Sequence, residues 1–175
     1  MDKPMPDWIF RSMIFLFKIR DSINSRDNVL EELDLQPGQT VLDFGCGTGV
    51  YSLLAAQKVG PEGKVFALDI HPLAIERIQQ ESRRMGLKNV TPIHSGCATN
   101  LPDESTDVIL LYDIFHLLSE QEKVLQELHR VIKPGGVLSF NDHHMRQDKI
   151  LAGVTNSGLF KFAEKKKWNY YFEKK

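Results

Sequence analysis

The sequence is poor in cysteine, with only Cys46 and Cys97 among 175 residues. Two thiols cannot supply a disulfide framework or a cysteine zinc site. A secretory signal is also missing, since the chain opens Met-Asp-Lys-Pro rather than with a basic stretch before an apolar run. We therefore expect a reduced protein of the cytoplasm.

Long apolar runs and an excess of one charge are absent as well. The longest uninterrupted apolar run near the N-terminus is 13–17, whereas a membrane-spanning helix needs about 20 apolar residues. The 22 basic and 23 acidic residues give a formal net charge of −1. This balance gives no electrostatic reason to expect duplex nucleic acid as a partner. Length and a hydrophobic content of 42% suit one compact domain.

Residues 1–35 differ from the rest of the chain. An aromatic-rich stretch is followed by apolar residues that recur between charges, which predicts an amphipathic helical segment of one or two helices. Packing on the core is the simplest interpretation. A membrane-surface or partner helix, or a lid over a ligand site, are the alternatives.

From residue 36 onward, short strands alternate with helices. Strands are expected over 40–44, 64–69, 90–94, 107–111 and 137–140, and the fourth is apolar enough to be buried on both faces. Such alternation predicts an α/β fold with right-handed crossovers and a doubly wound, mostly parallel sheet. The segments 159–164 and 168–172 then predict a C-terminal antiparallel hairpin, which makes seven strands. The lysines 165–167 would form its solvated turn.

Three helices connect these strands. The first should bury Leu53, Leu54 and Val59 and end at the Gly-Pro pair that follows. The second should begin at Pro72 and carry Leu73, Ile78 and Met85 on its apolar side. The third should begin at Ser119, which has capping-box spacing to Glu122. It should bury Val124, Leu128, Val131 and Ile132 and end at Pro134-Gly135-Gly136.

A glycine-rich loop follows the first strand, with the spacing Gly45-x-Gly47-x-Gly49. Glycine lets a ligand approach the backbone, and the helix that the loop opens presents free N–H groups. These are the needs of a nucleotide-like cofactor. The dinucleotide fingerprint would require glycine or alanine where this chain has Val50.

Asp69 ends the second strand, twenty residues after Gly49. A carboxylate in this place can accept two hydrogen bonds from a ribose diol. Helix capping before Pro72 would explain Asp69 equally well on its own. The glycine loop one crossover earlier favours ribose binding.

The segment Val41-Leu42-Asp43-Phe44-Gly45-Cys46-Gly47-Thr48-Gly49 resembles the first motif of class I S-adenosylmethionine-dependent methyltransferases. Asp69 matches the ribose-binding acid of that family, and segments 101–108 and 128–136 resemble its later motifs. The resemblance covers about 36–172 and implies a Rossmann-like, methyltransferase-like cofactor-binding domain over 36–175. It further implies S-adenosylmethionine as the cofactor and methyl transfer as the activity.

The resemblance also implies roles for single residues. Asp43 and the loop with Gly45, Cys46, Gly47 and Gly49 would hold the methionine end of the cofactor. Asp69 would hold the ribose, and Ile70 would pack against the adenine. Gly96, Cys97 and Ala98 would read the adenine edge, although Cys97 stands where an acidic residue is usual.

Polar residues at the ends of the fourth and fifth strands are candidates for the acceptor side. Tyr112 is also included among the residues that contact the cofactor. The others are Asp113, His116, Asn141, Asp142, His143 and His144. A general base is needed only for an acceptor that enters protonated, and no catalytic residue is assigned. A magnesium ion on Asp113, Asn141 and Asp142 is a minor alternative, because strand-end carboxylates have other common uses; the expected metal content is none.

The acceptor itself is not encoded in a motif, but a small molecule is favoured because the sequence holds no inserted substrate domain. The lack of a cysteine cluster argues against a thiol-bound metalloid. Two other functions stay open: a nicotinamide oxidoreductase with a degenerate loop, and a non-catalytic cofactor-binding regulator. The oligomeric state cannot be inferred.

Overall fold

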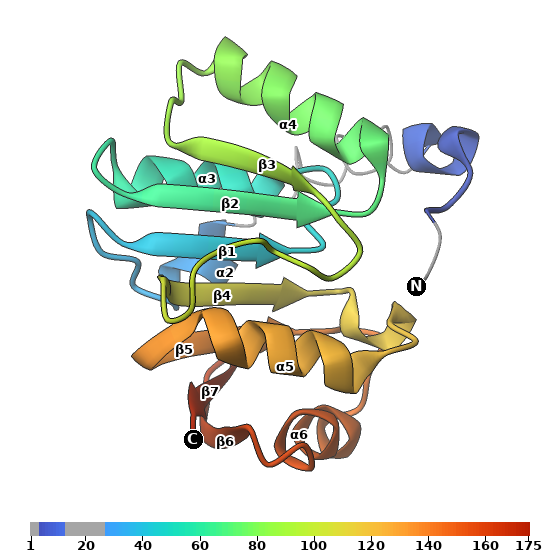
Figure 1. Ribbon diagram of the computed structural model, residues 1–175, viewed down its shortest axis with the longest axis vertical. Helices are drawn as coiled ribbons and strands as arrows, with labels where there is room; N and C mark the ends of the chain where they lie inside the picture. The colour runs from blue at the N-terminus through green and yellow to red at the C-terminus, as the bar shows by residue number, and fades with distance from the viewer. Residues whose placement is uncertain (1–3, 13–26) are drawn as a thin grey trace.

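The computed structural model describes residues 4–12 and 27–175 (Figure 1). Its seven-stranded sheet has the order β3-β2-β1-β4-β5-β7-β6. The first five strands are parallel, and β7 runs antiparallel to both of its neighbours. The predicted fold class is therefore confirmed. The strands are β1 (Thr40–Phe44), β2 (Lys64–Asp69), β3 (Val90–His94), β4 (Thr106–Tyr112), β5 (Ile132–Asn141), β6 (Phe160–Lys165) and β7 (Tyr170–Lys174).

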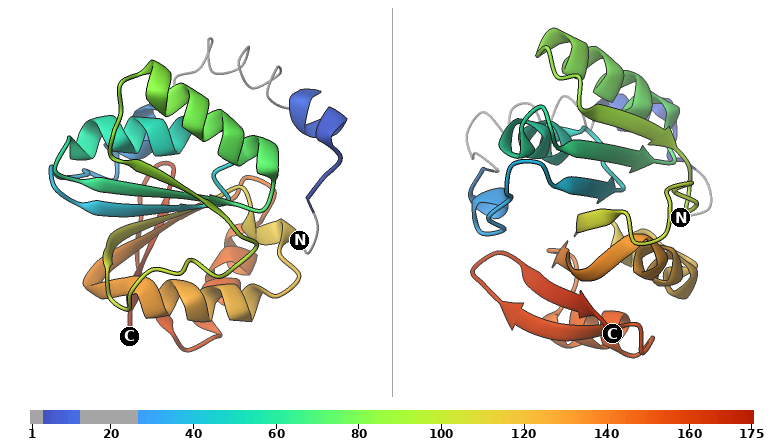
Figure 2. Two further views of the ribbon diagram at one scale, coloured as in Figure 1. Left: turned by 45° about the horizontal axis from the view of Figure 1, so that its top comes forward. Right: turned by 60° about the vertical axis from the view of Figure 1, so that its left-hand side comes forward.

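Helices cover both faces of the sheet (Figure 2). The helices are α2 (Asp27–Glu31), α3 (Val50–Val59), α4 (Pro72–Arg84), α5 (Gln121–Val131) and α6 (Gln147–Thr155), with a 3-10 turn η1 (Phe115–Leu117). Successive side chains of a strand point to opposite faces, so Val41 packs with α2 and α3 whereas Leu42 and Phe44 pack with α5 and α6. Alternate residues of β4 likewise pack against the helices on both faces of the sheet, as its continuous apolar run predicts.

Small residues, rather than the leucines, form the buried side of α3. Ser52, Ala55, Ala56 and Val59 are buried, and Leu53 and Leu54 are only half-buried. The prediction is confirmed for Val59 and wrong for Leu53 and Leu54, because Ser52 donates a hydrogen bond to Asp43 on β1 and the small residues face the sheet. The helix α4 differs in the same way. It buries Ala74, Ile78 and Ser82, and leaves Met85 exposed.

The helix α5 begins later and ends earlier than the sequence predicts. Glu120, not Ser119, occupies its N-cap and makes no side-chain capping bond. The helix ends at Val131, before the Pro-Gly-Gly turn, which instead lies within β5. There the register against β4 shifts, and a Cβ on Gly136 would lie 2.9 Å from the carbonyl oxygen of Asp107. Gly136 therefore permits the close approach of β5 to β4, and Gly135 adopts a positive φ that favours glycine.

The helix α6 was not predicted. It buries only Ile150 and Val154 and has no side-chain cap, so its sequence carries little helical signal. Residues 7–12 are helical, as is α2, which is consistent with the amphipathic segment expected over 1–35. Residues 1–3 and 13–26 of that segment lie outside the described residues.

The lysines 165–167 between β6 and β7 are exposed, as predicted, and the two residues that follow them contact the chain at the end of α2. The Glu32 carboxylate accepts hydrogen bonds from the backbone N–H of Trp168 at 3.0 Å and of Asn169 at 3.3 Å. The side chain of Asn169, which is fully buried, donates to the carbonyl of Val29 at 2.8 Å. The N-terminal part of the chain is thereby joined to the C-terminal hairpin.

Replacing Glu32 with alanine should lower the free energy of unfolding by about 1–2 kcal/mol, because two backbone donors lose their acceptor. Urea denaturation measures this change. Glu31→Ala is the matched control at the neighbouring exposed position, with an expected change within about 0.5 kcal/mol. Equal losses in the two variants would contradict the role given to Glu32.

Candidate functional site

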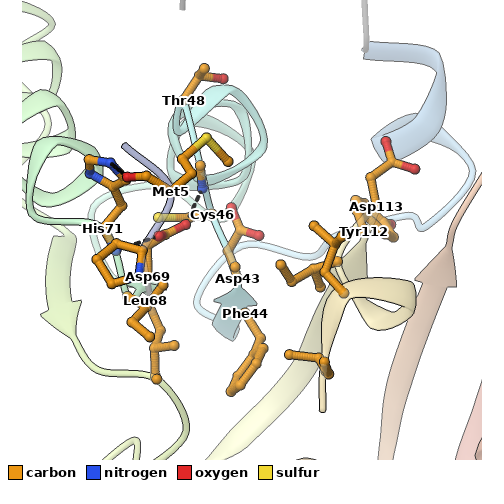
Figure 3. A pocket seen from close by; sticks show the side chains of 18 of the residues that line it. Met5, Asp43, Phe44, Cys46, Thr48, Leu68, Asp69, His71, Tyr112 and Asp113 are labelled. Atoms are coloured by element: carbon orange, nitrogen blue, oxygen red, sulfur yellow. Dashed lines mark hydrogen bonds between the residues drawn. The ribbon is translucent and has the colours of Figure 1, made fainter. Parts of the chain in front are cut away.

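A cavity of about 440 Å³ opens at the carboxyl ends of the strands. It lies over β1, β2 and β4 (Figure 3), where the strand order reverses between β1 and β4. Ligands of open α/β sheets bind at this switch point. Most of the residues predicted to bind the cofactor line the cavity together: Asp43, Gly45, Cys46, Gly47, Asp69, Ile70, Gly96 and Tyr112. Gly49, Cys97 and Ala98 do not.

Asp69 fixes the glycine loop to the end of β2. One carboxylate oxygen accepts from the backbone N–H of Gly47 at 2.8 Å, and the other accepts from that of His71 at 2.8 Å. Burial raises the pKa of Asp69, although these two hydrogen bonds oppose the rise. Each oxygen of a carboxylate can accept a second hydrogen bond. Asp69 can therefore hold the loop and still accept from the hydroxyl groups of a ligand.

The three loop glycines have different surroundings, although all have positive φ. A Cβ on Gly47 would meet nothing nearer than the Gly45 carbonyl oxygen at 4.0 Å, so the backbone here is open to a ligand. A Cβ on Gly49 would instead lie 2.1 Å from Cδ1 of Ile78 on α4. Gly49 thus permits α3 and α4 to pack closely. It faces α4 and does not line the cavity.

Asp43 places a second carboxylate in the cavity, at the end of β1. Its side chain accepts a hydrogen bond from the Ser52 hydroxyl at 2.5 Å through one oxygen, and is 2% exposed. Ser52, at the start of α3, is the residue that hydrogen-bonds to Asp43. Burial raises the pKa of Asp43 to about 7, and the charge of Asp69 adds to that rise. A buried carboxylate suits a cationic ligand group, which offsets the cost of its desolvation.

The wall after β3 is formed by Ser95 and Gly96, next to Ile70. A Cβ on Gly96 would lie 3.2 Å from Cδ1 of Ile70, so the two residues border one another closely. The chain then turns toward α5, where the Cys97 thiol contacts the Lys123 carbonyl at 3.9 Å. This turn carries Cys97 and Ala98 away from the cavity wall.

The remaining predicted residues are held by neighbours. Tyr112 shares a hydrogen bond of 2.7 Å with Ser139, and its ring contacts Tyr51 edge-on. Burial raises the pKa of Tyr112 well above its ordinary value, so its hydroxyl stays protonated. Burial also raises the pKa of the Cys46 thiol, which is therefore not a nucleophile at neutral pH.

The N-terminal strap, residues 4–12, borders the site through particular contacts that the sequence did not reveal. Pro4, Met5 and Phe10 line the cavity. The Phe10 ring stacks on the His71 ring at 4.1 Å, and the Met5 carbonyl lies 3.0 Å from Nε2 of His71. Nδ1 of His71 accepts from the Leu73 N–H, so Nε2 is the nitrogen that donates to Met5.

Polar residues on the acceptor side form two pairs. Nδ1 of His116 lies 2.8 Å from Asp142, and Nδ1 of His143 lies 2.5 Å from Asp113. Asn141 turns away and donates to the Trp168 carbonyl at 2.9 Å. The oxygen donors once considered for magnesium are thus committed to other partners. No group of three metal-ligating histidine, cysteine, aspartate or glutamate side chains occurs in the described part of the chain.

Comparison with known proteins matches residues 35–175 to the family described as "Methyltransferase domain". The demethylmenaquinone methyltransferase of Geobacillus stearothermophilus is 36% identical over 70% of this chain and 53% of its own length. The arsenite methyltransferase of Halobacterium salinarum is 36% identical over 62% of this chain and 28% of its own. The chain spans about half the length, or less, of these curated relatives.

A solved structure agrees over nearly the whole chain. The SAM-dependent methyltransferase from Aquifex aeolicus superposes with a TM-score of 0.79 at 29% identity, covering 92% of this chain and 94% of that one. None of the described helices is long and apolar enough to cross a bilayer.

Asp43→Asn should stabilise the ligand-free protein at about pH 8 but much less at about pH 5. With the folded pKa of Asp43 raised to about 7 from 3.8, the folded state holds this proton where the unfolded state has lost it. Stability therefore falls as pH rises through that window. We expect a gain of about 2 kcal/mol more at the higher pH, measured by urea denaturation.

The control for that experiment is Asp148→Asn, whose carboxyl is exposed on α6. Its effect should differ little between the two pH values. A gain from Asp43→Asn that is the same at both would contradict the raised pKa.

Proposed function

The chain belongs to the methyltransferase-domain family, and from this premise we propose that it binds S-adenosylmethionine in the cavity and transfers the methyl group to a small molecule. One observation carries the proposal. The carboxylate of Asp69 and the open backbone at Gly47 meet at the cavity wall, which the buried carboxylate of Asp43 also lines. The family match and the antiparallel hairpin favour this function over a nicotinamide oxidoreductase.

Each part of the cofactor has a complementary group in the cavity. The Asp69 carboxylate would accept from the ribose hydroxyls through its remaining lone pairs. The buried carboxylate of Asp43 would accept from the ammonium group of the methionine end. Ile70 and Gly96 would border the adenine. Gly47 would let the ligand lie against the backbone.

The bound cofactor supplies a methyl group on a positively charged sulfur, so its departure needs little help from the protein. The chain's contribution is to align the acceptor with that methyl group and to exclude water. The side of the cavity away from Asp69 has an apolar surface, formed by Tyr51, Tyr112, Ile114, Leu117 and Leu118. An acceptor with an apolar body would displace water from it.

The size of the cavity supports a small acceptor. A space of about 440 Å³ has to take both cofactor and acceptor, and typical small-molecule pockets measure about 300–1,000 Å³. The relatives are named for demethylmenaquinone and for arsenite. A thiol-bound metalloid is disfavoured because Cys46 is buried and Cys97 contacts α5. Both cysteines are free thiols, which supports a location in the cytoplasm.

The N-terminal strap would act as a lid, separate from the cofactor-binding domain over 36–175. Its Phe10 is 2% exposed although the neighbouring Trp8 is 71% exposed, so only one side of this short helix is anchored. The anchor is His71, the residue that caps α4 and donates its N–H to Asp69. Closing the strap would therefore be coupled to the group that holds the ribose.

Asp69→Asn should weaken S-adenosylhomocysteine binding by about tenfold or more, because a charged acceptor becomes a neutral one. Isothermal calorimetry gives the affinity, and circular dichroism checks that the fold persists. Asp103→Asn, an exposed carboxyl ion-paired with Arg130, is the control and should bind as the unaltered protein does. Equal affinity in the Asp69 variant, or no binding by the unaltered protein, would refute the proposed function.

Phe10→Ala should accelerate dissociation of S-adenosylhomocysteine by about tenfold, corresponding to about 1.4 kcal/mol of lost stacking and apolar contact. Stopped-flow displacement measures the rate. Trp8→Ala removes a larger ring from the exposed side of the same helix, and its rate should change by less than about twofold. The lid is ruled out if the two variants release the ligand equally fast.

A further inference from the structure

A histidine–carboxylate pair stands at the acceptor side of the cavity. Nδ1 of His116 lies 2.8 Å from Oδ2 of Asp142, and the backbone N–H of His116 donates to the same oxygen at 3.1 Å. The other oxygen of Asp142 accepts from the His144 N–H at 3.1 Å. Asp142 is 3% exposed. These contacts hold the carboxylate and, through it, the imidazole ring in one orientation.

The pairing determines which nitrogen of His116 can accept a proton. An ionised carboxylate can only accept hydrogen bonds, so Nδ1 carries the ring hydrogen and Nε2 keeps its lone pair. Nε2 has no hydrogen-bond partner within 4–12 and 27–175. His116 lines the cavity, and Nε2 is its nitrogen that can accept a proton.

The position of His116 places it away from the cofactor-binding carboxylates. His116 follows β4 and Asp142 follows β5, whereas Asp69 ends β2 on the other side of β1. Figure 3 shows the same separation for Asp69 and Asp113, which lie on opposite sides of Asp43. The neighbours of His116, Leu117 and Leu118, add apolar surface to the cavity wall. An acceptor next to the methyl group would meet this wall.

The second pair, His143 with Asp113, suits proton transfer less well. The side chain of His143 is 60% exposed and that of Asp113 32%, against 24% for His116 and 0% for Asp142. Solvent screens an exposed pair more strongly than a buried one. The protected pair is the better placed to stabilise a developing imidazolium charge.

We propose that His116 is the general base of the methyl transfer, with Asp142 as its positioning residue, and that the acceptor is an aromatic ring carrying an ionisable hydroxyl. The inference rests on the proposed function and specifies its substrate class. An acceptor that is already anionic or carries no proton would give a histidine–aspartate pair no task. The apolar wall suits the ring, and Nε2 suits the hydroxyl.

The step balances without any further reactant. The O–H bond of the acceptor breaks and its proton passes to Nε2 of His116, while the oxygen forms a bond to the methyl carbon. The carbon–sulfur bond breaks and its electron pair stays on sulfur, giving a methyl ether and the neutral thioether product. Asp142 stabilises the imidazolium until Nε2 of His116 releases the proton to solvent.

Two phenols separate proton removal from methyl transfer. At about pH 8, 4-methylphenol is protonated, whereas 4-nitrophenol is largely ionised and needs no base. His116→Ala should slow tritiated-methyl transfer to 4-methylphenol by about 100-fold or more, and to 4-nitrophenol by less than about threefold. Asp142→Asn should show the same selectivity with a smaller loss. His129→Ala, a histidine at the far end of α5, is the control and should change neither rate.

A second readout does not depend on turnover. In protein loaded with S-adenosylhomocysteine at about pH 6, 4-nitrophenol should gain phenolate absorption on binding to the unaltered protein and not to His116→Gln. Glutamine preserves a hydrogen bond to Asp142, so it guards against loss of the fold. Equal losses on both phenols, no phenolate signal, or methyl transfer to neither phenol would overturn the proposal. Failure to bind S-adenosylhomocysteine would overturn the proposed function as well.

Discussion

The carboxylate of Asp69 is the junction on which the site depends. It ends β2, accepts the N–H of Gly47 from the loop after β1, and accepts the N–H of His71 at the start of α4. His71 in turn binds the N-terminal strap, since it hydrogen-bonds to the Met5 carbonyl and stacks on the Phe10 ring. One buried charge thus joins two crossovers and the N-terminal segment, and its burial makes these hydrogen bonds costly to lose.

The two sides of the cavity differ in charge and polarity. Buried carboxylates, Asp43 and Asp69, lie on the side that suits a cationic adenosyl ligand, and desolvation raises the pKa of both. A cation bound next to them would favour the charged form of both carboxylates and so lower both pKa values. The other side offers apolar surface and the His116–Asp142 pair, an environment that suits an acceptor with a removable proton.

Local patterns revealed the sheet, the hairpin, the glycine loop and Asp69, because each depends on residues close in sequence. Contacts across the chain were not readable. Phe10 stacks on His71, and His116 pairs with Asp142, through folding alone. Likewise, no spacing rule indicated that Gly49 faces Ile78 instead of the cavity. The helix α6 escaped notice because two buried residues leave almost no periodicity.

A crystal structure of the complex with S-adenosylhomocysteine would show where the adenosyl ligand lies. We expect both ribose hydroxyls within hydrogen-bond distance of the Asp69 carboxylate, the amino group of the ligand toward Asp43, and the edge that faces the backbone at Gly47. Density for the ligand at another edge of the sheet, or a ribose without contact to Asp69, would contradict this expectation.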